Sequence, residues 1–169
     1  IIMTSCSQNS KTQRPYDNPF IVGFNKTIDF KSLKDGHITE GVDYVLNVAD
    51  EIKNEIISVP ESKKNFENTL LRIDDIYNVI ESVWSPGYLM GSVHTKESIR
   101  NEGIEASRTI QNYMTNLSLN EDLYNAVLSY SNTDNAKDLR GYKKKFLDDM
   151  LLGYKRTGFN LPKEERGKV

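Results

Sequence analysis

The sequence predicts an all-α protein, an antiparallel bundle of about five to six helices. Apolar residues recur at three- and four-residue steps through most of the chain, which is the period of a helix face. Residues that favour helix starts and helix ends separate these periodic segments, and no strand-like alternation competes with them. The 169 residues are enough for one domain with its own core.

Composition excludes several classes of function. The net charge of −2 gives no general attraction to nucleic acid or to anionic lipid, so no nucleic-acid partner is predicted. No apolar run reaches the length of about 18 residues that a membrane-spanning helix needs. The single cysteine, Cys6, cannot form an intrachain disulfide.

The first residues resemble the end of a bacterial lipoprotein signal peptide. Residues 1–5 are apolar and then small, Cys6 follows, and a polar stretch comes next. We expect residues 1–5 to be the end of the signal, Cys6 to carry a lipid that anchors the chain to the membrane, and residues 6–17 to be a tether. The expected location is the bacterial cell envelope. The alternative is an ordinary exposed cysteine on a frayed N-terminus, with a cytoplasmic location.

The first helix is predicted between an N-terminal lead-in and Pro60. Residues 18–37 are expected to be extended, because Pro15 and Pro19 disfavour helix. A helical domain is expected over residues 38–169, with Thr39 as the first N-cap. The apolar stripe of this helix contains Val42, Val45, Leu46, Ala49, Ile52 and Ile56.

Two further helices follow. The second is expected to begin after Asn65 and to end before Pro86, because proline and glycine interrupt a helix. Its stripe contains Phe66, Leu70, Ile73, Tyr77, Ile80 and Trp84. The third is expected over residues 95–117, and its small residues Gly103 and Ala106 allow a neighbouring helix to approach closely.

Three more helices are predicted toward the C-terminus. Ser118 and Glu121 form a capping-box pattern that starts the fourth. Asn135 is expected to start the fifth, whose stripe contains Leu139, Tyr142, Phe146, Met150 and Tyr154. Gly158 is expected to take the left-handed conformation after it, with Phe159 folding back. Pro162 is expected to open a sixth helix that the chain leaves unfinished at Val169, which indicates a fragment.

Candidate catalytic residues are scarce. His37 and His94 are far apart in sequence and neither belongs to an H-E-x-x-H helix, so no zinc site is predicted in this chain. The acidic pairs at residues 74–75 and 148–149, and the basic run at residues 143–145, are interpreted as solvated helix faces. For the basic run, an anionic partner is the alternative.

Four ordered segments of the chain match motifs that occur in the same order in one known family. The F-E-N-T motif matches Phe66, Glu67, Asn68 and Thr69. Later matches include Arg100, Glu105 and the helix pair around residues 119–124. The segment at residues 154–162 matches through Tyr154, Arg156, Gly158, Leu161 and Pro162. Asn18-Pro19-Phe20 fits the usual opening of that family. Together these segments resemble the thimet oligopeptidase, neurolysin and peptidyl-dipeptidase family of zinc metallopeptidases.

The resemblance implies a two-lobed helical peptidase whose deep channel admits short peptides. Its zinc ion, held by H-E-x-x-H and a later glutamate, would belong to a C-terminal catalytic domain that this chain lacks. The resemblance therefore implies that residues 66–169 belong to the N-terminal, non-catalytic lobe of a metalloendopeptidase or peptidyl-dipeptidase. This chain alone is expected to bind no zinc and to be inactive.

Two other interpretations stay open on the sequence. The chain is a free-standing helical lipoprotein that binds a partner in a groove between its helices, or it is a structural spacer made of helix pairs. The unfinished sixth helix favours the peptidase interpretation over both.

Overall fold

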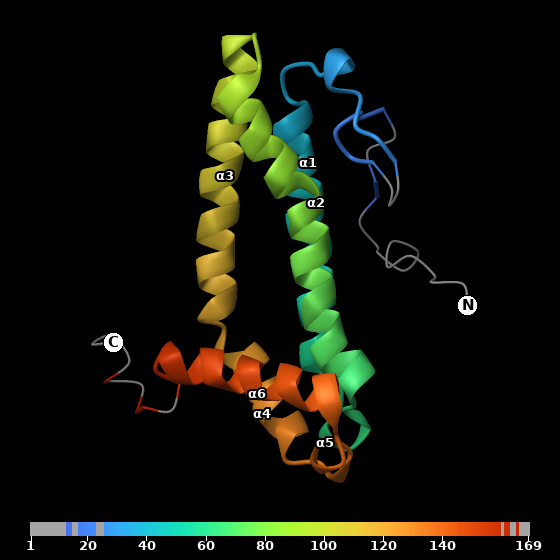
Figure 1. Ribbon diagram of the computed structural model, residues 1–169, viewed down its shortest axis with the longest axis vertical. Helices are drawn as coiled ribbons and strands as arrows, with labels where there is room; N and C mark the ends of the chain where they lie inside the picture. The colour runs from blue at the N-terminus through green and yellow to red at the C-terminus, as the bar shows by residue number, and fades with distance from the viewer. Residues whose placement is uncertain (1–12, 15–16, 23–25, 160, 163–164, 166–169) are drawn as a thin grey trace. The chain divides into compact units, whose positions relative to one another are not determined.

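The computed structural model of the protein describes residues 13–14, 17–22, 26–159, 161–162 and 165 (Figure 1). Throughout these residues the regular structure is helical and contains no strand, which confirms the all-α prediction. The helices are α1 (His37–Ser58), α2 (Leu71–Val93), α3 (Glu97–Ser118), α4 (Glu121–Ser131), α5 (Asp134–Lys137) and α6 (Gly141–Arg156). Short 3-10 turns occupy Phe30–Ser32 (η2) and Glu61–Lys63 (η3), and a π-helical turn occupies Phe66–Leu70 (η4). Among the described residues, none of these helices has the length and apolar character needed to cross a membrane.

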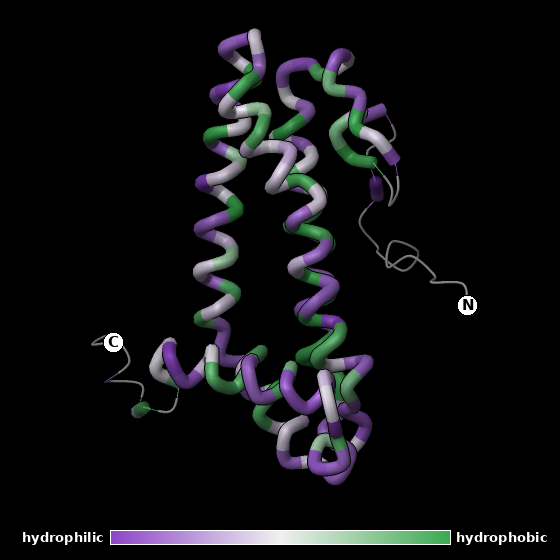
Figure 2. Tube along the Cα trace, in the orientation of Figure 1, coloured by the Kyte–Doolittle hydropathy of each residue, from purple (hydrophilic) through white to green (hydrophobic). Residues whose placement is uncertain are grey.

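The chain divides into two compact units. The first consists of Ile1–Glu51 and Asp75–Tyr113, and the second consists of Ile52–Asp74 and Met114–Val169. Within each long helix the apolar residues recur at intervals of about one turn, as Figure 2 shows along α3. This pattern buries one face of each helix, and the buried side chains form the core.

A close contact between glycines joins α2 and α3 in the first unit. A Cβ atom on Gly103 would lie 2.5 Å from the carbonyl oxygen of Gly87 and 2.5 Å from the backbone nitrogen of Gly91. The small residues at 103 and 106 therefore face a neighbouring helix, as the sequence predicts.

The same contact explains an error in the predicted end of the second helix. Pro86 does not end α2, which continues to Val93. Proline removes one backbone hydrogen bond from a helix interior. Here the turns that follow Pro86 pack their glycines against α3, and this packing favours continuation of the helix.

The predicted N-cap of the first helix is wrong, because Thr39 lies inside α1 and the cap comes from α3. The carboxylate of Glu102 accepts hydrogen bonds from the backbone N–H groups of Gly36, Ile38 (3.2 Å) and Thr39 (3.5 Å). A carboxylate at this end of a helix also interacts favourably with the helix dipole. A residue far along the chain therefore performs the capping role.

We expect Glu102→Ala to lower the free energy of unfolding by about 1 to 2 kcal/mol, because it leaves the first N–H groups of α1 without their acceptor. Glu105→Ala is the matched control on the same helix. Glu105 forms only an exposed ion pair with Arg108, so its loss should cost less than about 0.5 kcal/mol. Urea unfolding followed by circular dichroism measures both variants. Equal losses would contradict the capping role.

The lead-in contributes a residue to the core of the first unit. Asn18 and Ile21 close a turn through the hydrogen bond from Ile21 N to Asn18 O (3.2 Å), and the Phe20 side chain is 0% exposed. The Asn18 amide donates to the carbonyl of His37 (2.8 Å) and to the carboxylate of Glu40 (2.7 Å). These bonds fix the turn against the start of α1.

In the second unit, α4 contacts α5, α6, η3 and η4. The predicted cap of this helix is wrong: Asn120, and not Ser118, accepts from the Leu123 backbone N–H (2.8 Å). Ser118 lies within α3, where its hydroxyl donates to the carbonyl of Thr115 (2.7 Å). Serine and asparagine are both good N-caps. Because α3 extends to Ser118, Asn120 is the residue that caps α4.

The predicted fifth helix is in fact two helices. Thr133 caps the short α5, and α6 begins at Gly141, whose φ of +58° suits glycine. The predicted apolar stripe is also wrong at Tyr142, which is 76% exposed. The break between the helices changes the helical phase, so the two parts do not share one face.

The end of α6 agrees with the prediction. Gly158 has a φ of +87°, and the backbone N–H of Phe159 donates to the carbonyl of Tyr154 (3.1 Å). The Phe159 ring folds back onto Tyr124 and Tyr154, with ring centroids 4.7 and 5.5 Å away. This is a Schellman motif with its hydrophobic contact. Most of the predicted sixth helix lies outside the described residues.

Candidate functional site

The F-E-N-T segment lies in η4 of the second unit, directly before the start of α2 at Leu71. The Asn65 side chain accepts from the Asn68 backbone N–H (2.8 Å), and the Asn68 side chain accepts from the Asn65 backbone N–H (2.9 Å). This reciprocal pair satisfies two N–H groups at the helix start. The Asn68 amide also donates to the carbonyl of Lys63 (2.8 Å), and the Thr69 side chain is fully buried. Asn68 and Thr69 therefore have structural roles.

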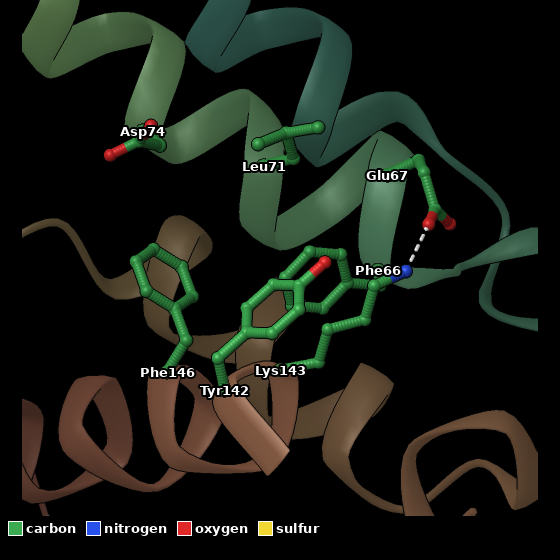
Figure 3. A pocket seen from close by; sticks show the side chains of 7 residues that line it. All are labelled: Phe66, Glu67, Leu71, Asp74, Tyr142, Lys143 and Phe146. Atoms are coloured by element: carbon green, nitrogen blue, oxygen red, sulfur yellow. Dashed lines mark hydrogen bonds and ion pairs between the residues drawn. The ribbon is translucent and has the colours of Figure 1, made fainter. Parts of the chain in front are cut away.

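Phe66 and Glu67 of the same segment line a groove of about 370 Å³. The opposite wall comes from α6, whose side chains Tyr142, Lys143 and Phe146 point toward η4 and the start of α2 (Figure 3). Leu71 and Asp74 complete the lining. The Phe66 and Phe146 rings meet edge to face, with centroids 6.1 Å apart.

An ion pair lies at one end of the groove. The ammonium of Lys143 is 2.7 Å from the carboxylate of Glu67 and 4.6 Å from the centroid of the Phe66 ring. The hydrogen bond from Lys143 lowers the pKa of Glu67, and the same bond raises the pKa of Lys143. Both groups are therefore charged at neutral pH. An aromatic face and a carboxylate together hold a cation.

The basic run at residues 143–145 spreads around α6. Lys144 pairs with Asp148 and Lys145 pairs with Asp149, both at exposed positions one helical turn away. These two pairs agree with the interpretation of a solvated face. Lys143 differs from them, because it pairs across the groove with η4.

The other family-like positions do not gather at this groove. Arg100 and Glu105 lie in the first unit, where Arg100 donates to the carbonyls of His94 (2.8 Å) and Thr95 (2.9 Å). Tyr154 is buried among aromatic rings, and Gly158 closes the end of α6. The remaining positions lie at or after the end of α6: Arg156 is exposed, Leu161 is half-buried and Pro162 is exposed. Arg100 and Gly158 therefore stabilise helix ends.

The donor groups in the described residues do not fit a zinc site. Across that part of the chain, no three His, Cys, Asp or Glu side chains come together as a metal site would require. His37 Nδ1 accepts from the backbone N–H of Lys34 (3.2 Å), and His94 Nδ1 accepts from that of Lys96 (3.1 Å). Both histidines therefore cap local turns. Cys6, the predicted lipid attachment site, lies outside the described residues.

Three lining residues were missed by reasoning from sequence. Leu71 is the second residue after the F-E-N-T segment, and Tyr142 was assigned to a buried stripe. Asp74 was assigned to a solvated surface. One feature of the sequence could have indicated the groove. Tyr142, Lys143 and Phe146 lie within about one turn of helix and combine aromatic with basic side chains.

Comparison with known proteins confirms the resemblance to oligopeptidases. The chain is 27% identical over 128 residues to a thimet-like oligopeptidase of Dictyostelium discoideum, which covers 74% of the chain and 19% of that protein. It is 25% identical over 151 residues to oligopeptidase A of Salmonella typhimurium and 24% identical over 151 residues to that of Escherichia coli, with 88% of the chain and 22% of each relative covered. No protein-family model matches the chain. The chain thus spans about a fifth of the length of these curated relatives.

Proposed function

We propose that this chain is the N-terminal, non-catalytic lobe of a zinc-dependent metallo-oligopeptidase that hydrolyses short peptides. In this proposal its helices help to form the wall of the channel that peptides enter. The supporting observation is the similarity to oligopeptidases over 74–88% of the chain. The parent protein is then the enzyme: its zinc ion belongs to another part of the parent, and its peptide substrates enter the channel that this chain helps to line.

In this proposal the described family-like residues support the fold and take no part in the chemistry. The F-E-N-T segment starts a helix, Arg100 joins the ends of α2 and α3, and the Gly158 motif ends α6. The donor groups of the described residues do not fit zinc, so we derive no reaction step for them. Lipid attachment at Cys6 in the cell envelope stays a prediction, as does the cytoplasmic alternative.

The proposal makes a direct prediction for the purified chain. Incubated with an internally quenched oligopeptide, it should cleave nothing, with added zinc or with a chelator present. Cleavage that requires zinc would contradict our assignment of the chemistry to another part of the parent.

The gene gives an independent test. Sequencing beyond the codon for Val169 should find a continuing frame that encodes H-E-x-x-H and a later glutamate. A frame that closes soon after Val169 would contradict the proposal and would leave a helical binding protein in its place.

A further inference from the structure

We propose that Asp35 is a modification site, where the chain converts to isoaspartate through a cyclic imide formed with Gly36. We also propose that residues at the start of α3 hold this reaction back in the folded chain. The site is the turn before α1 in the first unit. The inference goes beyond the proposed function and does not depend on it.

The Asp35-Gly36 step has the composition that this reaction needs. It is the only place in the sequence where aspartate or asparagine precedes glycine. A glycine carries no side chain that shields its backbone nitrogen, and it adopts conformations that other residues avoid. Gly36 has a φ of +93°, and both residues are exposed to water. The nucleophile and the water that the reaction uses are therefore accessible.

The reaction consists of two balanced steps. In the first, the Gly36 backbone nitrogen attacks the side-chain carboxyl carbon of Asp35, and one carboxyl oxygen leaves as water together with the proton of the nitrogen. In the second, water attacks the backbone carbonyl carbon of Asp35 and breaks its bond to that nitrogen. The main chain then runs through the Asp35 side chain, and the mass is unchanged. The neutral carboxyl group is the reactive form, because a carboxylate resists attack by a nucleophile.

Three side chains at or near the start of α3 hold the two reacting groups. The ammonium of Lys96 is 2.7 Å from one oxygen of the Asp35 carboxylate, and the hydroxyl of Ser98 donates to the other oxygen at 2.7 Å. The backbone N–H of Gly36 donates to the carboxylate of Glu102. Attack requires the carboxyl group to turn toward the Gly36 nitrogen, so these bonds must break first.

The same contacts keep the Asp35 carboxyl group in its unreactive form. The hydrogen bond from Lys96, followed by that from Ser98, lowers the pKa of Asp35. The ionised carboxylate is therefore favoured at neutral pH. Docking of α3 thus restrains the geometry of the carboxyl group and reduces the population of its reactive form.

Modification would also disturb the start of α1. Isoaspartate adds one carbon atom to the main chain between Asp35 and Gly36. The N–H groups of Gly36 and Ile38 both donate to Glu102, the latter at 3.2 Å. A longer connection displaces these groups from their acceptor, so the modified chain should lose the cap that Glu102 provides.

Ageing of the purified chain in neutral buffer tests the proposal, with a parallel sample kept unfolded in guanidinium chloride. Peptide mapping by liquid chromatography and mass spectrometry detects isoaspartate at Asp35 as a peptide of unchanged mass and altered retention. Transfer of a labelled methyl group from S-adenosylmethionine by an isoaspartyl methyltransferase confirms its identity. We expect the unfolded chain to form isoaspartate at least about fivefold faster than the folded chain.

Lys96→Met tests the restraint directly, because it removes the ammonium and keeps a side chain of similar length. It should raise the rate in the folded chain at least about threefold. Lys144→Met is the matched control, since Lys144 forms an exposed ion pair with Asp148 on α6 and should leave the rate unchanged. Circular dichroism checks that both variants are folded.

Three results would overturn the proposal. The unfolded chain could form no isoaspartate at Asp35, the folded and unfolded chains could react equally fast, or Lys96→Met could react no faster than Lys144→Met. The link to the cap has its own measurement. The modified chain, separated by chromatography, should unfold at a lower urea concentration than the unmodified chain, and an equal midpoint would overturn that link.

Discussion

Replacing Gly103 with alanine is expected to destabilise the chain by about 3 kcal/mol, at the upper end of the cost of overpacking a core. The new Cβ atom would lie 2.5 Å from two backbone atoms of α2 and 2.8 Å from the Cα of Gly91. A side chain can rotate away from such a clash, but helix backbone cannot. The two helices must therefore separate, which exposes the apolar faces that they bury. Urea unfolding followed by circular dichroism measures the loss.

Two other glycines in the same helix pair provide graded controls. A Cβ atom on Gly91 would lie 3.1 Å from the backbone of α3, and one on Gly87 would lie no closer than 3.7 Å to any neighbour. The loss of stability should therefore decrease in the order Gly103, Gly91, Gly87. Gly153→Ala on α6 meets no atom within 4 Å and should stabilise the chain by about 0.5 to 1 kcal/mol. Equal losses of stability for alanine at positions 103, 91 and 87 would contradict the close approach of α2 and α3.

Phe20→Ala is expected to lower the free energy of unfolding by about 3 to 4 kcal/mol, the usual cost of truncating a buried phenylalanine. Its ring lies against the places where α1 and α2 carry glycine: a Cβ on Gly41 would be 3.0 Å from the ring, and one on Gly87 would be 3.7 Å from it. No other side chain of the turn at residues 18–21 is fully buried. Removal of the ring therefore leaves a cavity and releases the turn.

Phe30→Ala is the matched control for this prediction. Phe30 is half-buried in η2 of the same lead-in, and its truncation should cost about 1 kcal/mol. Limited proteolysis adds a local measurement, because Phe20→Ala should expose the chain near residues 18–22 to cleavage and Phe30→Ala should not. If Phe20→Ala leaves both stability and proteolysis unchanged, the ring does not anchor the lead-in.

Reasoning from sequence succeeded where the determining interactions are local. The apolar periodicity of α1 and α3 correctly predicted these two helices. The glycine at position 158 correctly predicted how α6 ends. Each depends on residues within one or two turns of the chain. The break between α5 and α6 is also local, but it depends on the positive φ of Gly141, and a single glycine in a periodic segment is an ambiguous signal.

The errors at Pro86 and Thr39 arise because contacts with a distant segment outweigh the local signal. Pro86 carries a strong local signal to end a helix, and contact with α3 outweighs it. Thr39 is a good N-cap by composition, yet Glu102 occupies that role. The groove has the same origin: the F-E-N-T segment was recognisable in the sequence, but nothing in it indicates that Tyr142 and Lys143 lie opposite. Pairing of η4 with α6 depends on the tertiary structure.

The cap that Glu102 provides has a consequence for the order of folding during synthesis. The carboxylate lies 66 residues beyond the first N–H group that it satisfies. A ribosome adds those residues in about 3 to 13 seconds at 5 to 20 residues per second. During that interval the N–H groups of Gly36, Ile38 and Thr39 have only water as their acceptor, so the nascent helix frays at its start. We therefore expect α1 to gain its full length only after α3 has emerged from the ribosome and docked, which makes the first helix to be translated one of the later ones to be completed.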